Sequence, residues 1–451
     1  MKRPALRADA RYRVFDEARI VDYLLLCGWS QEIRRGDRRG AERGARDALE
    51  RWMQLGLPFT RAAKGGLRFD PAEVVNFLKW AGANHGDPFW DERFIANGRA
   101  LVREFQPMAG LQPGTALDTK LDALRFSFTL AREFSLREFS LREVPPDAPL
   151  RLRLPLPLED AALGDLAVEP VAPPDIDVEF TRAPGRLDAR VSRVAALTRP
   201  TITLGVRYSF TGSAASPRHE PLSRSDRALY TRPDEALIRV TPRVRALATR
   251  LAGAGPDPGI ALQRFRDFML DELTCGIVDY DGHDAAAATD RVLESGWFDC
   301  QVGSALLVAL CRAQDIPARL CSGYLLYAAS PSHHWWAEAW IAGRGWVPFD
   351  TLASDLSRGG RDGEWRDCFM GHLDYRMKTE CLPRLFNRSP GFRLPEAWRM
   401  LARADGDVTE IGLYDCDTGT AVQRDRIVVR HSVDASPDAG RVSPSVNATP
   451  L

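Results

Sequence analysis

Three residues in the second half of the chain, Cys300, His334 and Asp350, are of the types that carry out nucleophilic catalysis by a thiol. A cysteine thiolate attacks an electrophilic carbon, and one nitrogen of an imidazole ring exchanges a proton with the sulfur. A carboxylate on the other ring nitrogen fixes the tautomer of the imidazole. This chemistry requires three separate elements of the fold to bring the side chains together.

Cys300 stands where an amphipathic helix is predicted to begin, and Ile316-Pro317 ends the run. The apolar residues at helical spacing are Ala305, Leu306, Leu307, Ala309 and Leu310. A cysteine at a helix start faces free backbone N–H groups and the positive end of the dipole, which can lower its pKa from about 8.5 to roughly 3.5–7.5. We therefore expect a reactive thiol, although Asp299 would oppose thiolate formation if its side chain pointed inward.

His334 opens a segment with the alternating pattern of a β-strand. Trp336 and Glu338 fall on one face of this strand, and the residues between them fall on the other. Neighbouring residues of a strand point to opposite faces, so only one of His333 and His334 can reach Cys300.

Asp350 ends a second short strand, 345–349, which follows a glycine-containing turn at 343–345. Adjacent antiparallel strands joined by a tight turn would bring His334 and Asp350 close together. An alternative interpretation is that Asp350 is a turn residue without a catalytic role, because aspartate is common in turns.

This part of the chain resembles the transglutaminase-like superfamily of thiol enzymes. The resemblance rests on five matches in order: the Cys at the helix start, RAQDIPAR (312–319), SGY (322–324), His-x-Trp-x-Glu (334–338) and Gly-Trp-Val-Pro-x-Asp (345–350). It implies that Cys300 is the nucleophile, that His334 rather than His333 is the base, and that Asp350 is the orienting acid. The helix-ending glycine of the family is Asp315 here, a residue type that tolerates the left-handed conformation.

Further residues near the three candidates could support the reaction. The backbone N–H of Cys300 is the expected oxyanion donor, and Trp297 and Gln301 are candidates for the same oxyanion hole or for substrate contacts. Trp297 could equally be a packing residue. We expect Trp336 and Glu338 to lie in the core behind the catalytic residues.

No metal or cofactor site is expected. Zinc sites have cysteine or histidine pairs at short spacing, and the chain has no C-x(2–4)-C pair, while His333 and His334 are adjacent. No EF-hand-like run of acidic residues is present either.

The composition is that of an ordinary globular protein. The 451 residues are enough for roughly two to three domains. The 61 basic and 61 acidic residues give a formal net charge of zero, which does not favour nucleic acid or an anionic membrane as a partner. Without an apolar span or an export signal, a cytoplasmic location with mostly free thiols is expected.

The pattern of elements predicts an α+β protein with an N-terminal helical region and a β-sandwich-like domain, and the resemblance implies that a papain/transglutaminase-like thiol domain follows them. The expected ranges are 1–110 for the helical region, 116–232 for the β-sandwich-like domain, 233–432 for the catalytic domain and 433–451 for a disordered tail. The helices include one at 91–105, and late strands are expected near 408–414 and 426–430.

The resemblance implies acyl transfer at an amide or thioester carbonyl through a thioester on Cys300. Water as acceptor would make the protein a peptidase or amidase, and an amine would make it a transglutaminase or amide synthase. The acyl substrate would be a peptide, a protein or a small molecule. A second hypothesis is a catalytically inactive binding module with the same fold.

Overall fold

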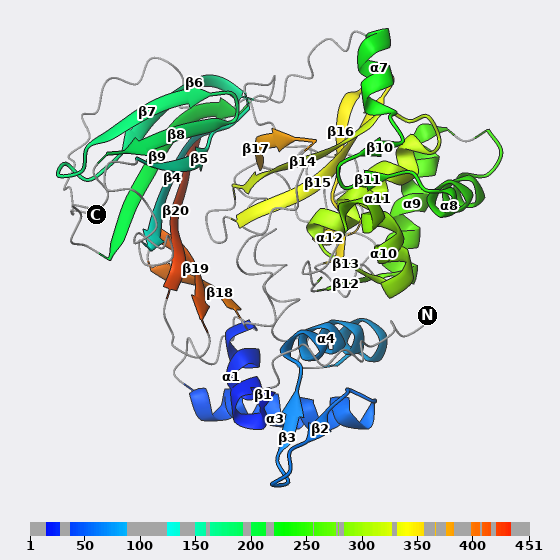
Figure 1. Cartoon of the computed structure of the whole chain (residues 1–451). Helices are drawn as coiled ribbons and strands as arrows, with labels where there is room; N and C mark the ends of the chain where they lie inside the picture. The colour runs from blue at the N-terminus through cyan, green and yellow to red at the C-terminus, as the bar shows by residue number, and fades with distance from the viewer. Residues whose placement is uncertain are drawn as a thin grey trace.

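The computed structural model describes residues 15–27, 37–87, 124–135, 149–158, 163–192, 200–212, 221–255, 257–276, 278, 284–326, 332–355, 366, 376–382, 398–405, 408–415 and 421–433. Three groups of elements are visible in Figure 1: N-terminal helices at the bottom, β-sheets at the upper left and a mixed helix–sheet unit at the right. The chain is therefore a mixed helix and sheet protein, as its sequence pattern indicates.

Helices near the N-terminus surround a small core of their own. The elements are α1 (Glu17–Cys27), α3 (Arg38–Gln54) and α4 (Pro71–His85), with a small sheet in the order β1 (Phe15–Asp16), β3 (Leu67–Phe69), β2 (Thr60–Arg61). The Asp37 carboxylate caps α3 by accepting a hydrogen bond from the Gly40 N–H. Trp52 is fully buried, and its indole N–H donates to Asp87. The helix expected at 91–105 lies outside the described residues.

Two antiparallel sheets form the second group. The larger sheet has the order β18 (Trp398–Asp405), β19 (Val408–Asp415), β20 (Ala421–Val433), β4 (Leu124–Ser135), β9 (Thr201–Gly212), β6 (Leu163–Val171); the smaller has the order β5 (Leu150–Pro155), β8 (Arg186–Val191), β7 (Val178–Ala183). Apolar residues alternate with polar ones along these strands, so each sheet has one apolar face, and the apolar faces of the two sheets pack together. Phe126 and Phe128 of the larger sheet share one hydrophobic core with Leu152 and Leu154 of the smaller sheet.

The late strands belong to the larger sheet and not to the catalytic unit, whose expected range of 233–432 included them. Strand β20 pairs antiparallel with β4 along its length. Arg132 on β4 and Asp425 on β20 reinforce this pairing through two hydrogen bonds of 2.8 Å. The partner of a strand is set by contacts distant in sequence, so local alternation identifies these strands without locating them.

The mixed unit consists of α7 (Arg224–Tyr230), β10 (Asp234–Glu235), β11 (Ile238–Arg239), α8 (Pro242–Ala252), α9 (Pro258–Glu272), β12 (Thr274–Cys275), η4 (Ala285–Ala287), α10 (Ala288–Ser295), β13 (Trp297–Phe298), α11 (Cys300–Arg312), β14 (Ala318–Leu325), β15 (Ser332–Ile341), β16 (Gly345–Phe349), α12 (Thr351–Asp355) and β17 (Arg376–Cys381). Four of its strands form an antiparallel sheet in the order β16-β15-β14-β17. Two short pairs, β10–β11 and β12–β13, accompany it. Thr241 and Asp257 cap α8 and α9, each followed by a proline at the helix start.

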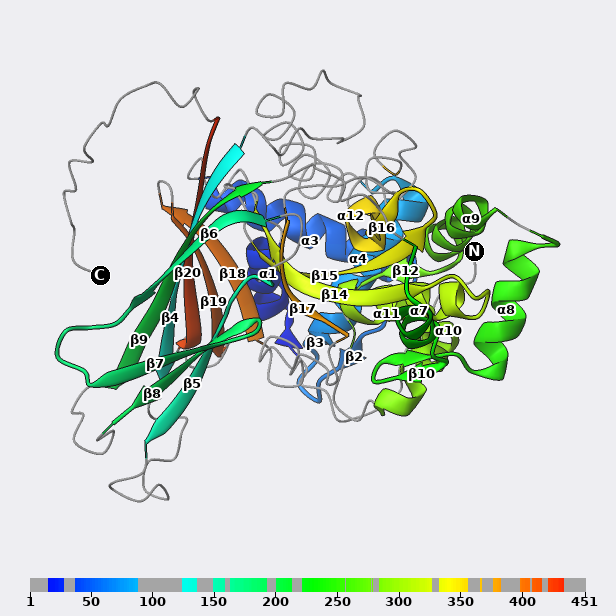
Figure 2. The same ribbon diagram turned by 90° about the horizontal axis from the view of Figure 1, so that it is seen from above.

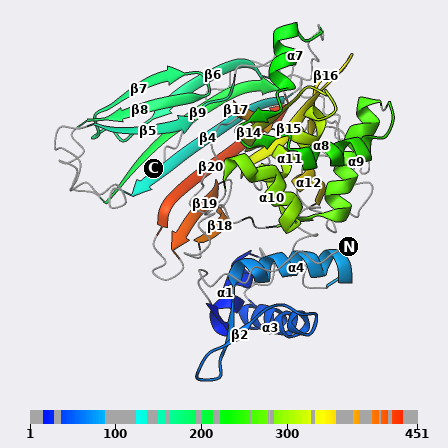
Figure 3. The same cartoon turned by 45° about the vertical axis from the view of Figure 1, so that its right-hand side comes forward.

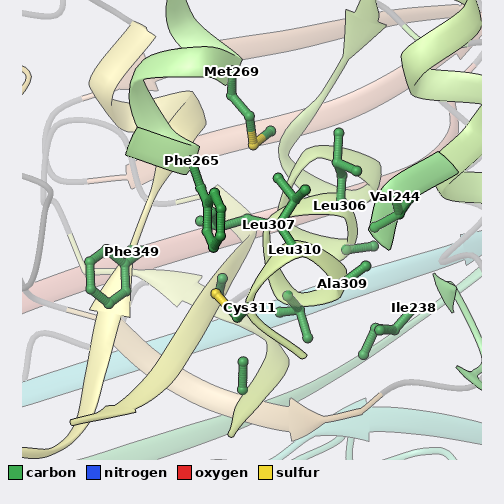
Figure 4. Close-up of a cluster of buried hydrophobic side chains, with 14 of the residues drawn as sticks. Ile238, Val244, Phe265, Met269, Leu306, Leu307, Ala309, Leu310, Cys311 and Phe349 are labelled. Carbon is green, nitrogen blue, oxygen red and sulfur yellow. The ribbon is translucent and has the colours of Figure 1, made fainter. Parts of the chain in front are cut away.

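Helix α11 is the centre of the mixed unit, because all of its residues from Gln301 to Arg312 are buried. Figure 4 shows Leu306, Leu307 and Leu310 of this helix among side chains from α8, α9 and β16. The helix ends in a turn in which Asp315 has a φ of 54°, as expected for the residue at the family's glycine position.

The four-stranded sheet lies between α11 and the two-sheet group, as Figure 2 shows for β14 and β15. Trp335 and Ala337 of β15 pack in the core around α11. Tyr324 and Met377 are instead buried in the core of the two sheets, where the Tyr324 ring meets Phe128 edge-on at 5.2 Å. None of the helices in the described ranges combines the length and apolar character needed to cross a membrane.

Candidate active site

Cys300 is the first residue of α11, as the apolar spacing predicts. Asp299 caps this helix, and its Oδ1 accepts hydrogen bonds of 3.0 Å from the backbone N–H groups of Gln301 and Val302. Two of the N–H groups that were expected to face the thiol are therefore bonded to a carboxylate. The helix start thus presents Cys300 with a negative charge as well as the positive end of the dipole.

The pKa of the Cys300 thiol is held well above its ordinary value. Burial is the largest cause, and the charge of Asp299 is the next; Cys275 and Asp350 act in the same direction. The backbone N–H of Trp335 opposes them by donating a hydrogen bond to the sulfur. Desolvation of the thiolate and the capping acid therefore oppose the effect expected of the helix start, and the reactivity of Cys300 stays a prediction.

Trp335 links α11 to the strand that carries His334. Besides the hydrogen bond from its N–H to Cys300, its carbonyl accepts a bond of 3.4 Å from the Ser304 hydroxyl, one turn further along the helix. Cys300 also packs against the core that contains Trp335. The thiol is therefore held against β15 at the residue that follows His334.

The structure brings His334 and Asp350 into direct contact. Nε2 of His334 lies 2.6 Å from Oδ2 of Asp350, and both side chains are buried. The neighbouring His333 is exposed. The pairing of β15 with β16 ends at the pair Ala337 and Phe349. Asp350 comes directly after Phe349, at the point where the two strands separate. Because Asp350 engages Nε2, Nδ1 is the ring nitrogen left for a different partner.

Asp350 has a second neighbour, the cationic Arg376, which the sequence pattern did not single out. Nη2 of Arg376 lies 3.1 Å from the same Oδ2, and its Cζ lies 4.8 Å from the centre of the Trp336 ring. The Ala353 N–H donates to Oδ1 at 2.8 Å. Burial by itself raises the pKa of Asp350, but the charges of His334 and Arg376 and these hydrogen bonds lower it to about 2. Asp350 is therefore a carboxylate at neutral pH.

Glu338 and Trp336 lie in the core, as expected. The Trp336 indole N–H donates to Oε1 of Glu338 at 3.1 Å. Oε2 of Glu338 is 2.6 Å from Nη2 of Arg319 on β14, and Nζ of Lys378 on β17 is 2.9 Å from Oε1. Burial opposes ionisation, but these two cations hold the pKa of Glu338 well below its usual range. Glu338 thus ties three strands together through charged hydrogen bonds.

The two remaining candidates from the sequence lie on either side of Asp299. Trp297 is half-buried on β13, and its ring covers Gly276, where a Cβ would come within 2.9 Å of Cε3. The side chain of Gln301 is buried. The oxyanion role expected for both stays a prediction.

Helix α4 of the N-terminal group packs beside this site, a contact that the sequence pattern did not reveal. Nζ of Lys79 lies 3.8 Å from Sγ of Cys275, on the strand that pairs with β13. Oδ1 of Asn76 is so close to Gly276 that a Cβ there would lie 2.4 Å away. Figure 3 shows α4 running beneath the mixed unit.

No group of three or more His, Cys, Asp or Glu side chains within the described ranges is arranged to hold a metal ion. The expectation of a site without metal or cofactor stays a prediction.

Comparison with known proteins locates a family match in the mixed unit. Residues 245–351 match the Transglutaminase-like superfamily. No curated protein sequence matches the chain. A solved structure of a candidate cysteine protease from Cytophaga hutchinsonii has 18% identity and a TM-score of 0.39, over 59% of this chain and 84% of that one. The periplasmic domain of TgpA from Pseudomonas aeruginosa has 17% identity and a TM-score of 0.30, over 55% and 96% of the two chains.

The matched range contains Cys300, His334 and Asp350, together with the helix and strands that hold them. The match supports a thiol enzyme in general terms and leaves its reaction open. Residues 245–351 of this chain are similar to the transglutaminase-like superfamily.

Proposed function

We propose that this protein transfers acyl groups from an amide or a thioester through a covalent thioester on Cys300. In this proposal His334 is the base and Asp350 is the carboxylate that orients it. The buried contact of 2.6 Å between His334 and Asp350 is the observation that carries the proposal. The hydrogen bond from Trp335 to the Cys300 thiol supports it, because it holds the sulfur beside the same strand.

The first step is transfer of the thiol proton from Cys300 to Nδ1 of His334. A base is needed because burial and Asp299 raise the pKa of the thiol. Asp350, with a pKa of about 2, stays anionic and stabilises the imidazolium that forms. The buried site thereby produces the thiolate as one half of an ion pair and not as an isolated anion.

The thiolate then attacks the carbonyl carbon of the substrate, and a tetrahedral oxyanion forms. The backbone N–H of Cys300 would stabilise it, with Trp297 and Gln301 as further candidates. The imidazolium of His334 protonates the leaving amine or thiol, and the C–N or C–S bond breaks to leave a thioester on Cys300.

The acceptor of the acyl group decides the biological role. Attack by water would make the protein a peptidase or amidase, and attack by an amine would make it a transglutaminase or amide synthase. The proposed substrates are peptides, proteins or small acyl compounds, with no role for nucleic acid or membranes.

The test is to incubate the protein with amide and thioester donors and a primary amine, and to identify the products by mass spectrometry. We expect hydrolysed or aminolysed product with the unmodified protein and none with Cys300→Ala. Cys311→Ala, on the buried part of the same helix, is the matched control and should keep its activity. Undiminished turnover by the Cys300→Ala variant would contradict the mechanism.

One observation favours the alternative of a binding module without catalysis. The Asp299 carboxylate beside Cys300 raises the pKa of the thiol, which disfavours a nucleophile. Alkylation by iodoacetamide at neutral pH separates the two hypotheses. An enzyme predicts that Cys300 reacts well before Cys311, whereas a binding module predicts that both react slowly.

We also propose a domain organisation for the chain. A helical unit over 1–110 precedes a β-sandwich-like unit that begins near 116, includes the strands up to Gly212 and is completed by the chain at 398–433, after the catalytic unit. The pairing of β20 with β4 and the core shared by the two sheets support this division.

A further inference from the structure

Two cysteines outside the catalytic site face each other across β14 and β17. Cys321 and Cys381 are directly opposed in the antiparallel register, and their sulfur atoms lie 3.6 Å apart. We propose that Cys321 and Cys381 form a reversible disulfide that locks β17 onto β14. The pair is a modification site independent of Cys300, which lies on another element of the fold.

The backbone around the pair has the geometry that a disulfide needs. The Leu382 N–H donates to the Leu320 carbonyl at 2.8 Å, so the flanking residues are the hydrogen-bonded pair. Cys321 and Cys381 between them therefore form a non-hydrogen-bonded pair, in which Cα atoms are about 4.5 Å apart. Disulfides span Cα separations of about 4.4–6.8 Å, so bond formation needs rotation of the side chains but no separation of the strands.

The two thiols differ in their exposure to solvent, and this difference determines which of them reacts first. Cys321 is fully buried, whereas Cys381 is half-buried on the edge strand of the four-stranded sheet. A hydrogen bond from Cys321 lowers the pKa of Cys381; burial and Glu338 oppose this effect, and the charges of Arg319 and Lys378 add to it. Burial raises the pKa of Cys321. Cys381 is thus the thiol that meets an oxidant from solution.

The oxidant we propose is a low-molecular-weight disulfide. The Cys381 thiolate attacks one sulfur of that compound, whose S–S bond breaks to release one thiol and leave a mixed disulfide on Cys381. Cys321 then loses its proton and attacks Sγ of Cys381, which releases the second thiol. The protein loses two electrons and two protons, and the small disulfide gains them as two thiols.

The disulfide would act on the catalytic site through β17, whose first residue is Arg376 and whose last is Cys381. Arg376 contacts the Asp350 carboxylate at 3.1 Å. A covalent link at one end of this short strand restricts the motion of the other end, so oxidation should hold Arg376 against Asp350. This consequence for activity rests on the proposed function, whereas disulfide formation does not.

The experiment exposes the full chain to oxidised glutathione, blocks the remaining thiols and maps the peptides by mass spectrometry without reduction. We expect a cross-linked peptide that joins Cys321 to Cys381 and lacks two hydrogens. In Cys321→Ala the mixed disulfide should accumulate on Cys381, because its resolving thiol is missing. Cys311, buried in α11, is the internal control and should stay reduced.

Two results would overturn the proposal. One is a mixed disulfide that persists on Cys381 in the unmodified protein without the cross-link. The other is a protein in which Cys321 and Cys381 both stay reduced.

A second measurement tests the mechanical link without any need for activity. Amide hydrogen exchange over 376–381 should slow down on oxidation of the unmodified protein, but not in a Cys321→Ser/Cys381→Ser variant treated in the same way. If the cross-link forms while exchange over β17 is unchanged, the coupling to Arg376 is refuted. If exchange slows but no turnover is found in either redox state, the proposed function fails while the disulfide stands.

Discussion

Oδ2 of Asp350 contacts two side chains, Nε2 of His334 at 2.6 Å and Nη2 of Arg376 at 3.1 Å. All three side chains are at most 7% exposed. A buried charge is costly unless it is paired, so the Arg376 guanidinium and the Asp350 carboxylate each support the ionisation of the other. The strand that supplies Arg376 is therefore part of what orients the proposed base.

Replacement of Arg376 should move the acid limb of the pH–activity profile to higher pH. The folded-state pKa of Asp350 is depressed to about 2, so its stabilising charge is present above the unfolded value of about 3.9 and is lost as pH falls toward 2. Arg376→Met raises that folded-state pKa and should lower stability by roughly 3 kcal/mol.

Arg376→Lys is the conservative variant, because lysine keeps the charge but loses the fork of guanidinium donors. Compared with Arg376→Met, this variant should keep more activity, and its acid limb should lie at lower pH, closer to that of the unmodified protein. An identical acid limb in Arg376→Met and the unmodified protein would show that Asp350 does not depend on Arg376.

Replacement of Asp299 by asparagine should make Cys300 more reactive toward iodoacetamide at neutral pH. The substitution removes the negative charge that raises the pKa of the thiol, so the thiolate forms at lower pH. Asparagine caps helices about as well as aspartate, so the free energy of unfolding should change by only a few tenths of a kcal/mol. Labelling is measured by peptide mass spectrometry with Cys311 as reference, and an unchanged rate for Cys300 would contradict the prediction.

Replacement of Glu338 by glutamine should destabilise the protein by roughly 3–5 kcal/mol, because Arg319 and Lys378 would then share a buried region without their counter-charge. Glu179→Gln is the matched control, since its contact with Arg190 is exposed and worth about 0–1 kcal/mol. Urea unfolding followed by circular dichroism measures both variants. Equal midpoints for the two variants would show that the buried charges contribute no more than the surface pair.

Replacement of Gly323 by alanine should push β17 away from β14. A Cβ at this position would lie 1.8 Å from the Met377 carbonyl oxygen, and backbone cannot move aside as a side chain can. We expect a loss of roughly 1–3 kcal/mol in stability and faster amide exchange over β17. Gly66→Ala is the control, because no atom lies within 4 Å of the Cβ it would add. Equal exchange over β17 in both variants would argue against the close approach.

Much of the local structure follows from the sequence because it depends on neighbouring residues. The apolar spacing after Cys300 and the Asp315-Ile316-Pro317 end delimit α11, which the structure places at Cys300–Arg312. Alternation and the glycine turn predict the strand that begins near His334 and the strand that ends just before Asp350. Apolar spacing, alternation and turn residues are each read from a few neighbouring positions, so these elements can be predicted without knowledge of the rest of the chain.

Only the tertiary structure decided which distant groups meet at the site and what charge they carry. Arg376 reaches Asp350 because β17 pairs with β14, and β20 joins β4, although no local pattern specifies either partner. The raised pKa of Cys300 depends on burial and on the position of the Asp299 carboxylate. Alternation tells which face a residue occupies, but strand partners and desolvation arise from contacts between segments far apart in the chain.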